Sequence, residues 1–178
     1  MIRNRVEALY SDNAEVAAFL GEQQQISYLS AAEDSFRKVL LLAAASYFET
    51  TLIDVVLTYV NGQLKPNHPL HKIVKTKGID RLYHTWFDWD VRNANKFFGM
   101  FGDDFKAYMR ARIEADPALE KGIAAFMEIG SLRNLLVHRN FAEFTVDKTP
   151  AEIYALYQSA IAFVYGLSGR LAEFTASI

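Results

Sequence analysis

The sequence predicts an all-α fold, an antiparallel four-helix bundle with extra short helices in a central insertion. Apolar residues recur at three- and four-residue spacing through most of the 178-residue chain, as they do on the buried face of a helix. The four prolines stand where a helix could begin or where a loop is expected, and no segment is a persuasive strand. We therefore expect residues 1–178 to form a single helical domain.

Two long helices are predicted in the N-terminal third of the chain. The first covers roughly residues 2–20 and ends near Gly21. The second covers about residues 30–60, where apolar residues keep a helical spacing throughout. The pair Asn61-Gly62 is expected to stop this second helix, because asparagine and glycine are common just past helix ends.

The central part of the chain has a different composition. Residues 63–77 form a basic stretch that is predicted to be a loop, with a helical turn after Pro69. Residues 78–102 are rich in aromatic side chains, for which core packing or contact with a partner is favoured over base stacking. A helix is predicted over residues 103–115, with acidic residues in its first turn.

Two further long helices have clear start signals. Asp116 can serve as an N-cap with Pro117 at the first helical position, and this helix should end near His138. Thr149 and Pro150 open the last helix in the same way.

The composition excludes several classes of protein. The absence of cysteine excludes disulfides, thiolate zinc sites and cysteine nucleophiles, and it favours a reducing cytoplasm. The most apolar run, residues 39–45, is far shorter than the roughly 20 residues of a membrane span, so we expect a soluble cytoplasmic protein without a membrane partner. The net charge of −2 excludes a general nucleic-acid coat, so any contact with RNA should be local.

The most informative segment is R-N-L-L-V-H, which runs from Arg133 to His138. A guanidinium that binds phosphate and an imidazole that exchanges protons near neutral pH are the groups needed to cleave RNA without a metal. Residues five apart on one helix point about 140° away from each other, so the two side chains should converge only if the helix ends near Val137 or if two chains meet. The alternative is a surface arginine and a histidine that satisfies carbonyl groups at the helix end.

Three segments resemble the HEPN superfamily (higher eukaryote and prokaryote nucleotide-binding). Residues 131–141, S-L-R-N-L-L-V-H-R-N-F, are similar to its ribonuclease branches. Residues 43–54, A-A-A-S-Y-F-E-T-T-L-I-D, look like the second-helix segment of the RiboL-PSP-HEPN group, and residues 97–102 resemble its central region. The resemblance spans roughly residues 30–169.

The resemblance implies that Arg133 and His138 are catalytic, with Asn134 as the polar residue beside the arginine and Glu49 as the supporting acid. It implies a metal-independent endoribonuclease that uses the ribose 2′-hydroxyl as nucleophile, needs no cofactor and acts as a homodimer with two motifs facing a shared cleft. The implied setting is a toxin–antitoxin, defence or stress system, with an antitoxin or another protein as partner. One HEPN branch has a tyrosine two residues after the histidine, where this chain has Asn140, so control through that tyrosine is not expected.

The residues themselves leave two of these roles open. Glu49 has apolar neighbours, so its carboxylate should either pair with Arg133 or face solvent on the polar side of its helix. Asn134 could hydrogen-bond phosphate, orient His138 or cap a turn. The alternative function is a non-catalytic helical module of HEPN type that dimerises or binds RNA or nucleotide, and the intact arginine–histidine pair favours the enzyme.

Other basic residues are weaker candidates. Arg139 could be a second phosphate ligand, and a basic patch that could track an RNA backbone consists of Lys72, Lys75, Lys77 and Arg81. A solvated loop explains all of these residues as well. His68 and His71 are expected to be loop residues and not metal ligands, because no third ligand falls at a convincing spacing. His84 is expected to be a packed or partly exposed ring.

Overall fold

The computed structural model describes residues 5–65 and 68–178, and the predicted all-α fold is confirmed, with no strand in the described ranges. The four long helices of the bundle are α1 (Arg5–Glu22), α2 (Ile26–Gln63), α7 (Pro117–His138) and α8 (Pro150–Ser177). The central insertion holds α3 (Pro69–Val74), the π-helix η1 (Lys75–Ile79), α4 (Tyr83–Trp86), α5 (Asn95–Gly99) and α6 (Asp103–Ala115).

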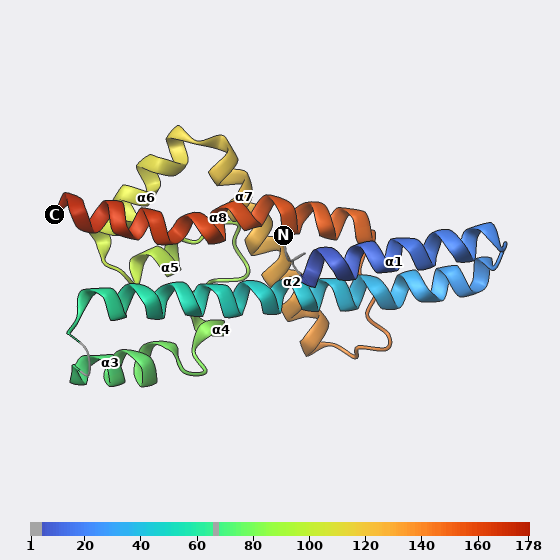
Figure 1. Cartoon of the computed structure of the whole chain (residues 1–178), viewed down its shortest axis with the longest axis horizontal. Helices are drawn as coiled ribbons and strands as arrows, with labels where there is room; N and C mark the ends of the chain where they lie inside the picture. The colour runs from blue at the N-terminus through green and yellow to red at the C-terminus, as the bar shows by residue number, and fades with distance from the viewer. Residues whose placement is uncertain (1–4, 66–67) are drawn as a thin grey trace.

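The long helix α2 runs the length of the molecule (Figure 1). α1 folds back on its first half as an antiparallel hairpin, and α8 lies alongside its second half. α7 packs against both α2 and α8, crossing them. The insertion is divided, with α3 beside the C-terminal turns of α2 and α5 and α6 nearer to α7 and α8.

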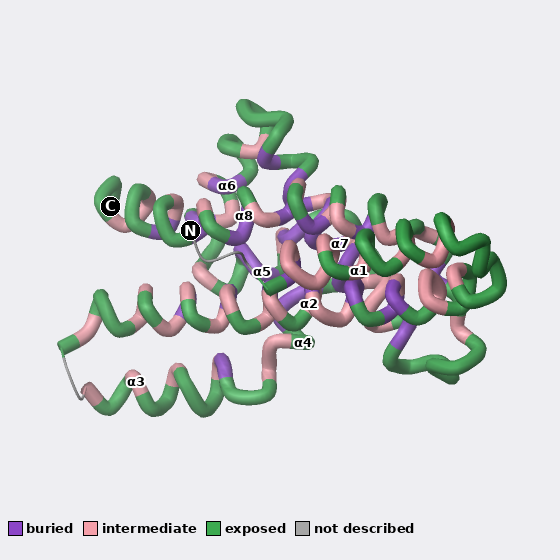
Figure 2. The backbone as a smooth tube through the Cα atoms, turned by 45° about the vertical axis from the view of Figure 1, so that its right-hand side comes forward, coloured by how far each residue is buried: buried purple, intermediate pink, exposed green. Residues whose placement is uncertain are grey.

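The core is dense in aromatic rings. Buried residues gather where α2, α5, α7 and α8 meet, whereas the tip of the α1–α2 hairpin is exposed (Figure 2). Phe126 of α7 lies near the centre, with its ring centroid 5.7 Å from that of Phe48, 4.9 Å from Phe87 and 5.4 Å from Phe163. Most aromatic residues of the insertion are therefore packing residues, as the sequence predicted.

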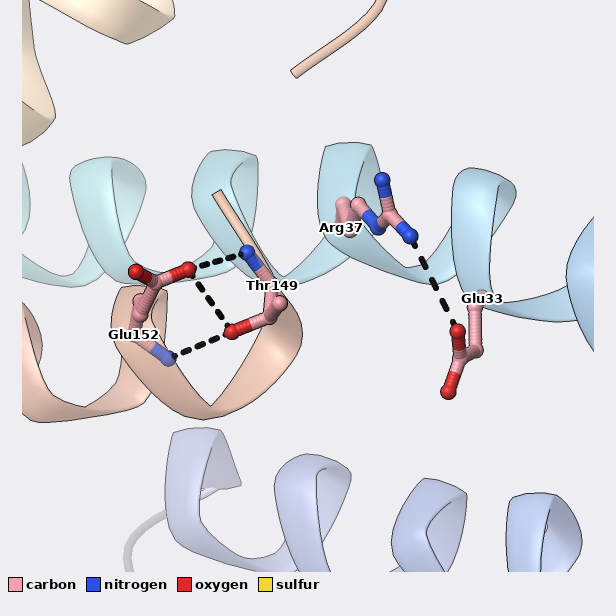
Figure 3. A network of polar contacts seen from close by, with 4 residues as sticks. All are labelled: Glu33, Arg37, Thr149 and Glu152. Atoms are coloured by element: carbon pink, nitrogen blue, oxygen red, sulfur yellow. Dashed lines mark hydrogen bonds and ion pairs between the residues drawn. The ribbon is translucent and has the colours of Figure 1, made fainter. Parts of the chain in front are cut away.

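The predicted helix starts are also confirmed. The Asp116 carboxylate accepts hydrogen bonds from the backbone N–H groups of Ala118 (3.0 Å) and Leu119 (3.2 Å). At the start of α8, the Thr149 hydroxyl oxygen accepts from the Glu152 backbone N–H (3.2 Å), and the Glu152 carboxylate accepts from the Thr149 backbone N–H (2.8 Å) (Figure 3). This reciprocal capping box satisfies backbone donors that have no partner inside the helix.

Two expectations for the N-terminal half were wrong. Asn61-Gly62 does not stop α2, which continues to Gln63 before the chain becomes extended at Leu64. A contact with α8 supports these last turns, because the Tyr59 hydroxyl lies 2.9 Å from the Thr175 hydroxyl. The basic stretch is also more ordered than a loop, since α3 and η1 occupy most of it.

α2 corrects a further expectation, about membrane spans. By length and composition alone, it is the one helix in the described ranges that could cross a membrane, with a mean hydropathy of 1.7 over its most apolar window. In the structure it packs against α1, α7 and α8, and its buried residues belong to the core. These contacts leave 33% of the residues in that window buried.

Candidate active site

A cavity of about 370 Å³ lies between α2, the C-terminal half of α7 and residues 81–89. We call it the α2–α7 cavity. Its polar lining consists of Glu49, Arg81, Tyr83, His84, Arg133, Asn134 and His138. Its other lining residues are Ala45, Phe48, Trp89, Phe126, Ile129, Gly130 and Val137. The cavity thus brings together the four residues that the sequence placed at the centre of the site.

Arg133 and His138 reach the cavity from one unbroken helix. α7 includes His138, and Arg139 follows it with extended backbone (φ −104°, ψ 169°). The two side chains leave the helix about 140° apart, and Val137 between them also lines the cavity. The helix thus ends at His138, close to the predicted end, and both side chains line the same cavity.

Asn134 contacts the arginine directly. The Arg133 Nη1 donates a hydrogen bond to the Asn134 Oδ1 over 3.3 Å, and both side chains are half-buried. Among the roles left open by the sequence, the geometry therefore favours orientation of a charged neighbour over capping of a turn. The neighbour is Arg133, whereas the sequence had suggested His138.

Glu49 enters the cavity from α2 without an ion partner. The ion pairs found in the described ranges involve other acids, and none joins Glu49 to Arg133. Its carboxylate has no hydrogen bond there either. Of the two alternatives that the sequence left open for Glu49, the direct pair with Arg133 is thus not formed, although both side chains line the same cavity.

Tyr83 lies in the electric field of both charges. Burial raises the pKa of its hydroxyl far above the ordinary value, the Glu49 carboxylate raises it further, and the Arg133 guanidinium lowers it. The phenol is therefore neutral at physiological pH and can donate a hydrogen bond in the cavity.

Residues 81–89 cover the cavity, and Trp89 sets their distance from α7. A Cβ atom on Gly130 would lie only 1.9 Å from the Trp89 ring, so the indole rests directly on the glycine backbone. The Trp89 Nε1 donates to the His84 carbonyl oxygen over 3.2 Å. Arg81 adopts a φ of +62°, which is uncommon for a residue with a side chain. The two contacts of Trp89 hold residues 81–89 against α7, where they form one wall of the cavity.

Lys38 holds the chain that follows the motif. Although its side chain is buried, its Nζ donates to the Phe141 carbonyl oxygen over 3.2 Å and lies 3.1 Å from the Asp34 carboxylate. The same nitrogen lies 5.4 Å from the centroid of the Phe141 ring. The contact ties α2 to the loop that begins one residue after His138.

A second hollow, of about 330 Å³, adjoins the cavity. Trp89, Asn134 and His138 line both spaces, so His138 lies at their border. Arg139 lines the second hollow and not the cavity, with its guanidinium carbon 5.7 Å from the centroid of the Phe144 ring.

The remaining basic candidates lie away from the cavity lining. Lys72 is an exposed residue of α3, and Lys75 and Lys77 are exposed residues of η1. His68 caps α3, because its Nδ1 accepts from the Leu70 backbone N–H over 3.2 Å. No cluster of three or more histidine, aspartate or glutamate residues in the described ranges could hold a metal ion.

Four members of the cavity were not placed in the site by the sequence: Arg81, Tyr83, His84 and Trp89. Arg81 was a candidate only as part of a basic patch, and packing was favoured over base stacking for the aromatic residues. The density of aromatic residues in this stretch was a visible signal, but it indicated packing, and most of its rings do pack. Lys38 was missed as well, although a lysine directly before the apolar run at residues 39–45 has few ways to reach water.

The RiboL-PSP-HEPN family model matches residues 7–173, which include every residue that lines the α2–α7 cavity. No curated protein and no solved structure matches the chain. HEPN domains often are ribonucleases, and they often dimerise and bind RNA, so the match indicates an RNA-related role. By its sequence and its helical fold, this chain belongs to the RiboL-PSP-HEPN family.

Proposed function

We propose that the α2–α7 cavity is the catalytic centre of a metal-independent endoribonuclease formed by residues 1–178 as one domain. The observation that carries the proposal is that Arg133, Asn134 and His138 line one cavity in a single chain. A guanidinium held by a neighbouring amide and an exposed imidazole at the cavity border suit phosphate binding and proton transfer.

In the proposed reaction, a base removes the proton of the ribose 2′-hydroxyl while the 2′-oxygen attacks the adjacent phosphorus. The bond from phosphorus to the 5′-oxygen breaks, and an acid protonates that oxygen. The products are a 2′,3′-cyclic phosphate and a 5′-hydroxyl end. Arg133 neutralises the charge that builds on the phosphate oxygens, and His138 serves as the base or the acid. Every group in this scheme belongs to the protein or the RNA.

Two sources can supply the second proton carrier. His84 lines the same cavity as His138 and offers an imidazole within one chain. A homodimer would offer another copy of His138. The exposed apolar residues Leu135 and Val137 in the motif and Phe141 just after it favour such a contact. A His84→Ala variant that loses the acidic or the basic limb of the pH–rate profile would assign the role to His84.

The proposed setting is the cytoplasm, in a toxin–antitoxin, defence or stress system. RNA is the proposed substrate, and an antitoxin or another protein is a proposed partner. Arg139 supports a path for the RNA backbone beyond the cavity, because it lines the adjoining hollow. Lys72, Lys75 and Lys77 could extend that path only if the RNA continues over α3 and η1.

The test is cleavage of mixed RNA by the purified protein in EDTA. We expect wild-type cleavage that leaves cyclic phosphate ends, and a rate lower by about 10²–10⁴-fold in His138→Ala and Arg133→Ala. Arg110→Ala, which alters an exposed arginine on α6, is the matched control and should cleave normally. Cleavage that survives both motif substitutions would refute the proposed site. RNA binding without cleavage would favour the non-catalytic module.

A further inference from the structure

The unpartnered carboxylate of Glu49 has a consequence for what the cavity binds. Glu49 is half-buried on α2, and in the described ranges neither an ion pair nor a hydrogen bond satisfies it. Its oxygens are not among the buried polar side-chain atoms that lack a partner in the described ranges, so the carboxylate is accessible to a ligand in the cavity. A ligand that presents two N–H donors at this point would donate to both of its oxygens.

The walls around Glu49 suit a flat ring. Four aromatic residues line the cavity, and two of them, Phe48 and Phe126, are fully buried. Tyr83 and Trp89 are half-buried, so part of each ring remains available to a ligand. Unpaired RNA bases stack on such rings and are recognised through their Watson–Crick edges. The volume of about 370 Å³ falls in the range of small-ligand pockets, roughly 300–1,000 Å³.

Among the four RNA bases, guanine alone presents two adjacent N–H donors on its Watson–Crick edge, at N1 and at the 2-amino group. A carboxylate can accept both with its two oxygens. Adenine presents an acceptor at N1, which a carboxylate repels. Uracil and cytosine each present one donor group beside acceptors.

We propose that the α2–α7 cavity binds the guanine base of an unpaired nucleotide, with Glu49 accepting hydrogen bonds from N1–H and the 2-amino group. The inference rests on the proposed ribonuclease function, of which it names the substrate class. The guanine-bearing nucleotide lies next to the scissile phosphate, because Arg133 and His138 line the same cavity and His138 also borders the adjoining hollow. Glu49 is in this view a specificity residue that touches the substrate.

The first experiment measures binding and needs no cleavage. Guanosine, inosine and adenosine 5′-monophosphates are titrated into the wild-type protein by calorimetry. Inosine keeps N1–H but lacks the 2-amino group. We expect the guanosine nucleotide to bind at least about tenfold more tightly than the adenosine nucleotide, with the inosine nucleotide between them. Glu49→Gln should abolish the preference, and Glu33→Gln, an acid elsewhere on α2, should leave it unchanged.

Equal binding of the three nucleotides, or no binding, would overturn the inference. A guanine preference that persists in Glu49→Gln would overturn the role of Glu49.

A single-guanosine oligonucleotide, compared with its adenosine and inosine versions, supplies the second readout. Cleavage without base preference would contradict guanine recognition but support the ribonuclease function. Selective binding of guanine without any cleavage would contradict the ribonuclease function but support guanine recognition. If Glu49 only positions Arg133, Glu49→Gln should slow cleavage of all three oligonucleotides equally, which would also contradict the inference.

Discussion

Lys38 shows how one charged residue can be retained inside an apolar helix face. Its side chain is 5% exposed, yet its amine has a carboxylate, a carbonyl oxygen and an aromatic ring as partners. Buried charges persist in proteins when they are paired and hydrogen-bonded in this way. Because two of the partners belong to Phe141, the stability of the loop after the motif depends on Lys38.

We predict that Lys38→Met lowers the free energy of unfolding by about 1–3 kcal/mol, because it leaves the Phe141 carbonyl without its donor. Urea denaturation measures the change, and amide exchange should show faster opening of residues 139–149. Arg37→Met is the control on the same helix. Its pair with Glu33 spans 3.7 Å and is partly exposed, so its loss should cost no more than about 0.5 kcal/mol. Equal effects of the two variants would show that Lys38 has no special role.

At the residue scale, the identity of the site residues was easier to predict from the sequence than the hydrogen bonds and ion pairs that they form. Arg133, Asn134, His138 and Glu49 were each identified from the sequence, and all four line one cavity. Their contacts were not predictable, because the Arg133–Asn134 bond and the unpartnered state of Glu49 depend on rotamers and on the wall at residues 81–89. Whether these residues are catalytic stays a prediction.

At the scale of elements, α7 and α8 approach each other closely at Gly122. A Cβ atom there would lie 2.8 Å from the Ser159 carbonyl oxygen, which belongs to the backbone of α8 and cannot easily move. The small residue therefore sets the distance between two helices of the core, one of which carries the motif.

Gly122→Ala should accordingly lower the free energy of unfolding by about 1–3 kcal/mol through overpacking. Gly169→Ala, in α8, has open space around the added methyl and should instead raise it by up to about 1 kcal/mol through a better helix propensity. Chemical denaturation of the two variants compares a close contact with an open position. Stabilisation by both substitutions would contradict the close approach.

The cap of α8 gives a pH-dependent prediction. The backbone N–H and the hydroxyl of Thr149 donate to the Glu152 carboxylate and hold its pKa below the ordinary value of 4.5. Because the folded-state pKa is lowered, this stabilisation is present above pH 4.5 and is lost as the pH falls through the lowered pKa.

Glu152→Gln should therefore be less stable than wild type at pH 7, and the difference should shrink as the pH falls below 4.5. Denaturation curves at a series of pH values measure this difference. Glu143→Gln, an exposed acid in the preceding loop, should show little difference at any pH. A difference for Glu152→Gln that is constant down to pH 2 would rule out the carboxylate as its source.

Element boundaries were predictable where local chemistry determines them. Asp116, Pro117, Thr149 and Pro150 start their helices through their own side chains, so the sequence was sufficient. The end of α2 was not predictable, because contact with α8 outweighs the local preference of Asn61-Gly62. The wall at residues 81–89 was missed for a similar reason, since it depends on Trp89 packing on Gly130.

At the scale of the whole molecule, two groups are notable among the exposed apolar side chains. One group consists of Leu135 and Val137 in the motif and Phe141 just after it. The other lies toward the tip of the projecting α1–α2 hairpin and consists of Val16, Phe19, Ile26 and Tyr28. Either group could be covered in an assembly.

For the proposed homodimer, we expect the group that contains Leu135 to be the interface. Leu135→Glu should convert the dimer to a monomer in sedimentation velocity and lower the cleavage rate, because a buried unpaired carboxylate opposes association. Phe19→Glu, at the hairpin, is the matched control and should remain dimeric. The opposite pattern would place the interface on the hairpin and separate dimerisation from the site.

Because Trp89 packs on Gly130 at the cavity, its fluorescence should report whether the proposed nucleotide is bound. The chain has two tryptophans, of which Trp86 is buried and Trp89 forms a wall of the cavity. In a Trp86→Phe variant, all indole emission would come from Trp89, and guanosine 5′-monophosphate should quench or shift it on binding. In a Trp89→Phe variant, which keeps Trp86, the tryptophan emission should not change in the same titration. The occupancy of the cavity could then be followed in real time without any label.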